Sequence, residues 1–131
     1  MWKEVLIIVF IGIFFSILFL QSSLDKVFNW KSEMEFNKQH FGKTFLKPFT
    51  PLMLIVLTLM EFSCGVLSIA GIYMLLRNGE TIVSCYANSL CATTFIALFF
   101  GQRIAKDYGG AQSLVNYFTV SLIGIYLCFP A

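Results

Sequence analysis

Glu61 is the residue in this sequence whose type and position most clearly allow chemistry. It lies ten residues into an uncharged stretch that begins at Pro51, which is about 15 Å along a helix. An ionised carboxylate is costly at that depth in a membrane, so the side chain must be protonated, paired or directed into a polar cavity. Two interpretations remain open: a proton or ligand site inside a helix bundle, and a hydrogen-bonded structural acid.

Glu61 shares one helical stripe with mainly small residues, which allows a neighbouring helix to approach closely. That stripe also contains Cys64, Gly65, Ser68 and Ile72. The next apolar stretch carries a comparable stripe of Ser84, Asn88, Cys91 and Phe95. We expect Asn88, with Ser84 beside it, to face the buried acid and to donate a hydrogen bond to it.

A second group of polar residues closes two of the apolar stretches. Asp25 and Lys26 end the first stretch, and Gln102 and Arg103 end the third. If both ends lie on the same side of a membrane, an ion pair between Asp25 and Arg103 becomes possible. Such interfacial pairs fix helix ends more often than they perform chemistry.

Several kinds of catalytic centre have no residues in this sequence. His40 is the only histidine and the four cysteines form no C-x-x-C pair, so we expect neither a bis-histidine haem nor a zinc cluster. No glycine-rich phosphate loop or G-x-S-x-G motif is present. We expect no metal and no intrinsic cofactor, with a quinone or a lipid as the small molecules left open. The cysteines are interpreted as small packing residues.

The composition requires lipid as the solvent for most of the chain. Of 131 residues, 58% are hydrophobic and only 12% are charged, whereas a soluble domain carries about 25% charged residues. So few charges cannot cover the large relative surface of a chain this short. The net charge of +2 gives no electrostatic case for binding nucleic acid.

Four apolar stretches are each long enough to cross a hydrocarbon layer of about 30 Å as a helix. They cover residues 5–24, 51–76, 81–102 and 108–129. Open sheets are excluded in lipid because their edges would leave backbone groups unpaired. The sequence therefore predicts an all-α, integral membrane four-helix bundle that forms one domain over residues 1–131.

The connections between these spans carry turn and orientation signals. Thr50 is expected to cap the second span, with Pro51 in its first helical position. Asn78 and Gly79 predict a tight turn that makes the second and third spans an antiparallel hairpin. Seven Lys and Arg residues lie on the side of the long connection and two on the other, which places the long connection in the cytoplasm and both termini outside.

The long connection, residues 27–47, predicts an amphipathic segment at the membrane surface. Its apolar residues fall within a sector of about 60° on a helix, and they are Val27, Trp30, Met34, Phe41 and Phe45. We expect a helix from Trp30 to Phe41 with Trp30, Met34 and Phe41 buried. Glu33 and Asn37 are expected to point away from the apolar stripe.

Four short segments suggest a family. Residues 24–26 read Leu-Asp-Lys at the end of the first span, and residues 61–65 place a glutamate four residues before a glycine. With the segments 40–49 and 100–107, these motifs resemble the DoxX-like family of small four-helix bacterial membrane proteins, in the form typical of Bacteroidetes. The sequence departs from the family at Ser23, where glycine is frequent.

The resemblance implies a multi-pass protein of the bacterial inner (cytoplasmic) membrane, in a family with members linked to quinone-dependent oxidoreductases. The first interpretation is a non-catalytic accessory subunit that contacts the lipid bilayer and other integral membrane proteins. The alternatives are a quinone-associated oxidoreductase subunit that uses Glu61 as proton acceptor, and a small proton-coupled carrier. Partner contacts are expected at two pairs of small residues, Gly12 with Ser16 and Ser121 with Gly124.

Overall fold

The computed structural model describes residues 2–128, and most of them are helical. The elements are α1 (Trp2–Phe28), α2 (Trp30–His40), the short 3-10 helix η1 (Lys47–Phe49), α3 (Thr50–Asn78), α4 (Ile82–Ile104) and α5 (Tyr108–Cys128). No strand occurs within the described residues. The predicted all-α fold class is confirmed, and the predicted end of the last span at Phe129 lies outside the described part of the chain.

Four of these helices, α1, α3, α4 and α5, are long and apolar enough to cross a membrane. They correspond to the four predicted spans, although α1 extends past residues 5–24 at both ends. Many large apolar side chains point outward, among them Phe10, which is 61% exposed, and Leu59, which is 63% exposed. Exposure on this scale is expected where lipid rather than water surrounds the helices.

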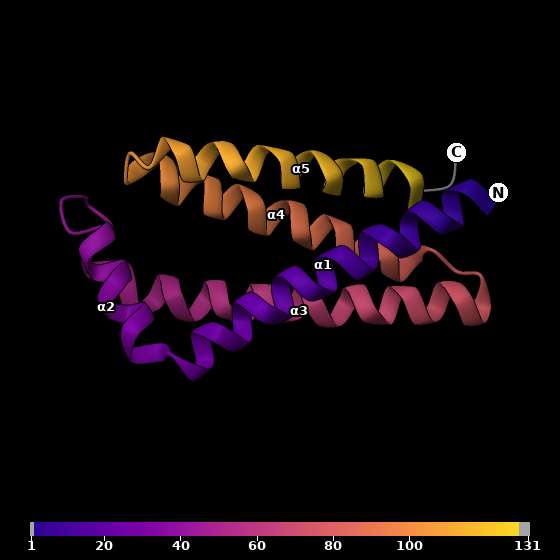
Figure 1. The fold of residues 1–131 in the computed structure, drawn as a ribbon, viewed down its shortest axis with the longest axis horizontal. Helices are drawn as coiled ribbons and strands as arrows, with labels where there is room; N and C mark the ends of the chain where they lie inside the picture. Colours follow the sequence, from indigo (N-terminus) through magenta and orange to yellow (C-terminus); the bar gives the residue numbers. More distant parts are fainter. Residues whose placement is uncertain (1, 129–131) are drawn as a thin grey trace.

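The four long helices lie roughly along one axis (Figure 1). α1 packs mainly against α3, and α4 packs between α3 and α5. The end of α1, all of α2, the start of α3 and the end of α4 gather at one end of the bundle, while the start of α1 and the end of α5 lie at the other. This end of the bundle is called the α2 end below. The first turns of α1 and the last turn of α5 therefore lie at the same end, and the predicted placement of Met1 and Ala131 lies outside the described residues.

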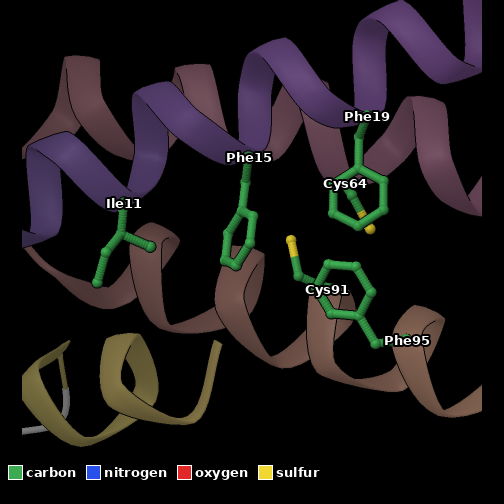
Figure 2. Packing of buried hydrophobic residues seen from close by; sticks show 6 residues of the cluster. All are labelled: Ile11, Phe15, Phe19, Cys64, Cys91 and Phe95. Carbon is green, nitrogen blue, oxygen red and sulfur yellow. The ribbon is translucent and has the colours of Figure 1, made fainter. Parts of the chain in front are cut away.

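An aromatic core holds α1 against α4. Figure 2 shows the rings of Phe15 and Phe19 reaching from α1 toward Phe95 on α4. The ring centroids of Phe15 and Phe95 are 5.6 Å apart, and those of Phe19 and Phe95 are 5.1 Å apart, which are favourable aromatic separations. Cys64 and Cys91 complete this cluster as fully buried free thiols.

The small residues predicted to bind partners are used inside the bundle instead. A Cβ added to Gly12 would lie 2.8 Å from Cγ1 of Ile72 on α3. Gly124 lies directly against the side chain of Asn88 on α4, and Ser121 is fully buried. The prediction of partner contacts at these positions is therefore wrong, because close approach between the chain's own helices already occupies the small faces.

The turns follow the predicted positions, with one correction. Gly79 ends α3 in the left-handed conformation with φ of 70°, as a tight turn at this position requires. Thr50 does not cap α3. It is the first residue of the helix, and its hydroxyl donates a hydrogen bond of 2.9 Å back to the carbonyl oxygen of Lys47, because η1 runs directly into α3.

Helix α4 ends in a Schellman arrangement that places a lysine where glycine is usual. Lys106 has φ of 61°, and the amide of Asp107 donates to the carbonyl of Gln102 at 2.9 Å. A Cβ is unfavourable in this conformation. We therefore expect Lys106→Gly to raise the free energy of unfolding by about 1 kcal/mol. Lys106→Ala is the control, since it removes the same charge but keeps the Cβ. An equal gain in both variants, measured by thermal unfolding in detergent, would contradict the strain argument.

Helix α2 forms where the amphipathic pattern predicted it, but a different face turns inward. Phe41 is buried, Trp30 and Met34 are only half-buried, and Val27 and Phe45 are exposed at 57% and 68%. The predicted apolar stripe is therefore wrong at both ends. Val27 belongs to α1 and Phe45 follows the end of α2, so the stripe is divided among three segments that do not share one helix axis.

Candidate functional site

Glu61 lies inside the bundle and is paired with Lys26. The Glu61 side chain is 2% exposed, and its Oε1 is 3.0 Å from Nζ of Lys26. The same Nζ donates to Oε2 at 3.2 Å. Of the three states expected for a buried acid, the structure shows the paired one. Lys26 comes from the last turns of α1, and Glu61 from a point well inside α3.

The Lys26 ammonium makes two hydrogen bonds and one further close contact with the Glu61 carboxylate. Besides the two carboxylate oxygens of Glu61, it donates to Oγ of Ser22 at 2.8 Å, one helical turn earlier on α1. An ammonium group has three donors and no acceptor. The pair is therefore a closed unit that satisfies a buried acid, and such an arrangement is costly to break from one side.

A small cavity of about 130 Å³ lies beside this pair. Its wall is mostly apolar and is formed by Leu18, Phe19, Ser22, Lys26, Glu61, Phe95, Leu98, Leu114 and Tyr117. A space of this size holds a few waters at most. Glu61 thus faces a nearly filled interior.

Asn88 and Ser84 lie elsewhere, so the predicted hydrogen bond from Asn88 to Glu61 is wrong. Nδ2 of Asn88 donates to the carbonyl oxygen of Ser84 at 2.8 Å, and Ser84 itself packs against Gly71. The antiparallel register of α3 and α4 explains the error. Gly71 faces Ser84 and Cys64 faces Thr94, so Glu61, nearer the start of α3, lies beside the later residues of α4.

The predicted polar cluster at the helix ends does not assemble. Lys26 binds Glu61, and Gln102 Oε1 lies 2.7 Å from Nε2 of His40. The guanidinium of Arg103 lies over the ring of Tyr108, 4.6 Å from its centroid. Asp25 is exposed, and no ion pair joins it to Arg103 among residues 2–128. Asp25 and Arg103 lie at the same end of the bundle but are not paired with each other.

A larger cavity lies at the α2 end and was not predicted. It has a volume of about 550 Å³ and is bordered by α2, the first turns of α3 and the last turns of α4. Most of its wall is apolar, formed by residues such as Met53, Leu57 and Met60 on α3 and Ala97 on α4. The polar residues in its lining are Lys26, Glu33, Asn37, His40, Thr50 and Gln102.

One face of α2 supplies the roof of this cavity. Its residues follow helical spacing and are Glu33, Phe36, Asn37, His40 and Phe41. The sequence shows the helical spacing of the polar residues Glu33, Asn37 and His40, but its apolar stripe predicts that a different face of α2 points inward. A roof above an open cavity accepts polar groups that a packed core would exclude, so hydrophobicity alone could not identify this face.

His40 ties this roof to the end of α4. Besides its contact with Gln102, its Nε2 is 3.9 Å from Oδ2 of Asp107. The ring stacks on Phe36 with centroids 5.5 Å apart and meets Phe41 edge-on at 5.0 Å. These contacts fix the last turn of α2 over the cavity. No group of three or more residues able to hold a metal ion forms within residues 2–128.

Comparison of the chain with models of known protein families, with curated proteins and with solved structures found no match. Fold and site therefore define a class rather than a family: a helical bundle with four candidate membrane spans, a closed ion pair in its interior and a large cavity at one end. The resemblance to the DoxX-like family stays a prediction.

Proposed function

We propose that this chain is a non-catalytic membrane protein whose chemistry is binding, and that its cavity at the α2 end holds an amphipathic, membrane-soluble molecule. As an accessory subunit it presents this molecule to neighbouring integral membrane proteins. The observation that carries the proposal is the cavity of about 550 Å³ with an apolar wall and polar groups in its roof. Pockets that hold drug-sized ligands have this size and this combination of surfaces.

The Lys26–Glu61 pair favours binding over the two alternatives that need a free acid. A proton acceptor for a quinone and a coupling site for a carrier both require a carboxylate that can exchange its proton. Glu61 is 2% exposed and held by an ammonium group at 3.0 Å. The apolar wall of the cavity also suits a quinone, without Glu61 taking part.

The location in a bacterial inner membrane belongs to this proposal and rests on the resemblance to the DoxX-like family. The partner-facing surface is proposed to consist of the large exposed apolar side chains, since the small-residue faces are buried inside the bundle. Lipid covers these side chains where no partner does.

The binding proposal predicts that filling the cavity expels its occupant. Ala97 lines the open side of the cavity and is itself exposed, whereas its neighbour Ile96 is exposed but outside the lining. We expect Ala97→Trp to lose most of the amphipathic molecule that is extracted from the purified chain in nanodiscs and measured by mass spectrometry. Ile96→Trp, which adds the same ring on the outer surface, should retain it. Equal amounts in the two variants would contradict binding in this cavity.

A further inference from the structure

When the charged groups that already have partners are excluded, the cavity lining carries a net negative charge. Lys26 is the one lysine or arginine in the lining, but its ammonium donates to Ser22 and Glu61 and forms an ion pair with the Glu61 carboxylate. Its charge is therefore matched within the protein and not by an anionic head group. The other lysines at this end, including Lys31, Lys38 and Lys47, are exposed to solvent, where salt screens their charges.

His40 adds no net positive charge to the cavity. Its Nε2 faces Gln102 Oε1 at 2.7 Å and Asp107 Oδ2 at 3.9 Å. A protonated imidazole at this position is matched by the Asp107 carboxylate, and a neutral one contributes no charge. Asp107 in turn accepts a hydrogen bond from the amide of Gly110 at 3.0 Å, which holds the carboxylate in place.

Glu33 is the charged group in the lining that remains without a partner. It is half-buried on the cavity face of α2, and no hydrogen bond or ion pair engages its carboxylate among the residues that the structure describes. Asn37, one turn later, donates its Nδ2 to the carbonyl oxygen of Glu33 at 2.8 Å. That bond leaves Oδ1 of Asn37 as an acceptor beside the free carboxylate.

The surrounding side chains also suit a cation. Phe36 and Phe41 line the cavity next to Glu33 and Asn37, and aromatic faces attract ammonium groups. The apolar wall formed by Met53, Leu57 and Met60 suits an alkyl or aromatic tail. The cavity therefore has one surface for the charged head group of a ligand and another for its apolar tail.

We propose that the occupant of this cavity is a cationic amphiphile, whose protonated amine binds the Glu33 carboxylate and whose apolar tail lies against α3 and α4. This inference rests on the binding function proposed above and specifies its ligand class. An anionic amphiphile finds no unpaired lysine or arginine in the lining, and it would place its charge beside Glu33.

The test uses three photoreactive probes with the same diazirine-bearing dodecyl chain and a primary amine, an alcohol or a carboxylic acid as head group. The full chain is placed in phosphatidylcholine nanodiscs at pH 7, and labelling of the α3 segment from Leu52 to Met60 is measured by peptide mass spectrometry. We expect the amine to label this segment about tenfold more than the alcohol and the acid to label it least.

Glu33→Gln and Glu35→Gln form a matched pair, because both remove one negative charge from α2 but Glu35 is exposed and outside the cavity lining. Glu33→Gln should lower labelling by the amine about tenfold, to the level of the alcohol, while Glu35→Gln leaves it unchanged. Equal labelling by amine and alcohol in the unmodified chain, or a preference for the acid, would overturn the inference about charge.

Failure of the underlying binding proposal has a different signature. If none of the three probes labels the segment, or if Ala97→Trp leaves all labelling intact, the cavity does not bind amphiphiles and both proposals fall. Phosphatidylethanolamine separates two sources of the same ammonium group. If phosphatidylethanolamine competes with the amine probe, the occupant is a lipid head group. If it does not compete, the occupant is a free amine.

Discussion

Lys26→Met is expected to destabilise the bundle by about 3–5 kcal/mol, because it leaves the Glu61 carboxylate buried without its cation. Glu61 is 2% exposed, so water replaces the lost ammonium far less well than it would at the surface. The free energy of unfolding in mixed micelles of mild detergent and dodecyl sulfate measures the loss. Lys38→Met is the matched control, since Lys38 is exposed on α2 and its replacement should change stability by less than about 0.5 kcal/mol.

A second substitution distinguishes loss of the pair from loss of the lysine side chain. Lys26→Met combined with Glu61→Leu removes both charges, and apolar replacement of a whole buried pair is often neutral or stabilising. The double variant should therefore recover most of the stability that Lys26→Met loses. A double variant as unstable as the single one would show that the ion pair is not the source of the effect.

Gly124→Ala is expected to destabilise the packing of α5 on α4 by about 1–3 kcal/mol. The added Cβ would lie 2.5 Å from Cγ of Asn88 and closer still to its Oδ1. Gly109→Ala provides the control on the same helix, because a Cβ at Gly109 meets nothing within 4 Å. Thermal unfolding in detergent should show a loss for Gly124→Ala and little change, or a small gain, for Gly109→Ala.

A substitution of Asn88 is expected to relieve this clash. Its Oδ1 is buried without a hydrogen-bond partner among residues 2–128, so the side chain contributes less than a fully satisfied amide would. Asn88→Ala removes the three atoms that lie nearest to the new Cβ. The variant with both substitutions should be no less stable than Asn88→Ala alone. Additive losses would contradict a direct clash between the two side chains.

The spans and turns of this fold were predictable because their signals are local. A helix in lipid must be apolar over its whole length, and Gly79 marks a left-handed turn by its own conformational freedom. The pairing of Glu61 was not local. Its partner depended on which turn of α1 lies beside α3, and Lys26 is separated from Glu61 by 35 residues. The sequence indicated that the acid required a partner but did not identify it.

The cavity at the α2 end was missed for a related reason. Amphipathic patterns identify a face that packs against a core, whereas the roof of a cavity mixes Glu33 and His40 with Phe36 and Phe41. Such a face has no distinct hydrophobic period. The same limit applies to Gly12 and Gly124, whose small size predicted close helix contacts without indicating that the contacting helices belong to this chain.

The unequal lengths of the helices have a consequence for the surrounding bilayer. α1 and α3, which pack together, have 27 and 29 residues, whereas α4 and α5 have 23 and 21. At 1.5 Å per residue the first pair is about 41–44 Å long and the second about 32–35 Å. The apolar part of α1 is shorter than the helix, because Glu4 and Lys26 lie in its first and last turns, whereas α3 is uncharged from Pro51 to Leu76 except for Glu61. A hydrophobic stretch longer than the hydrocarbon layer is accommodated by tilting. We therefore expect α3 to tilt in a bilayer of ordinary thickness.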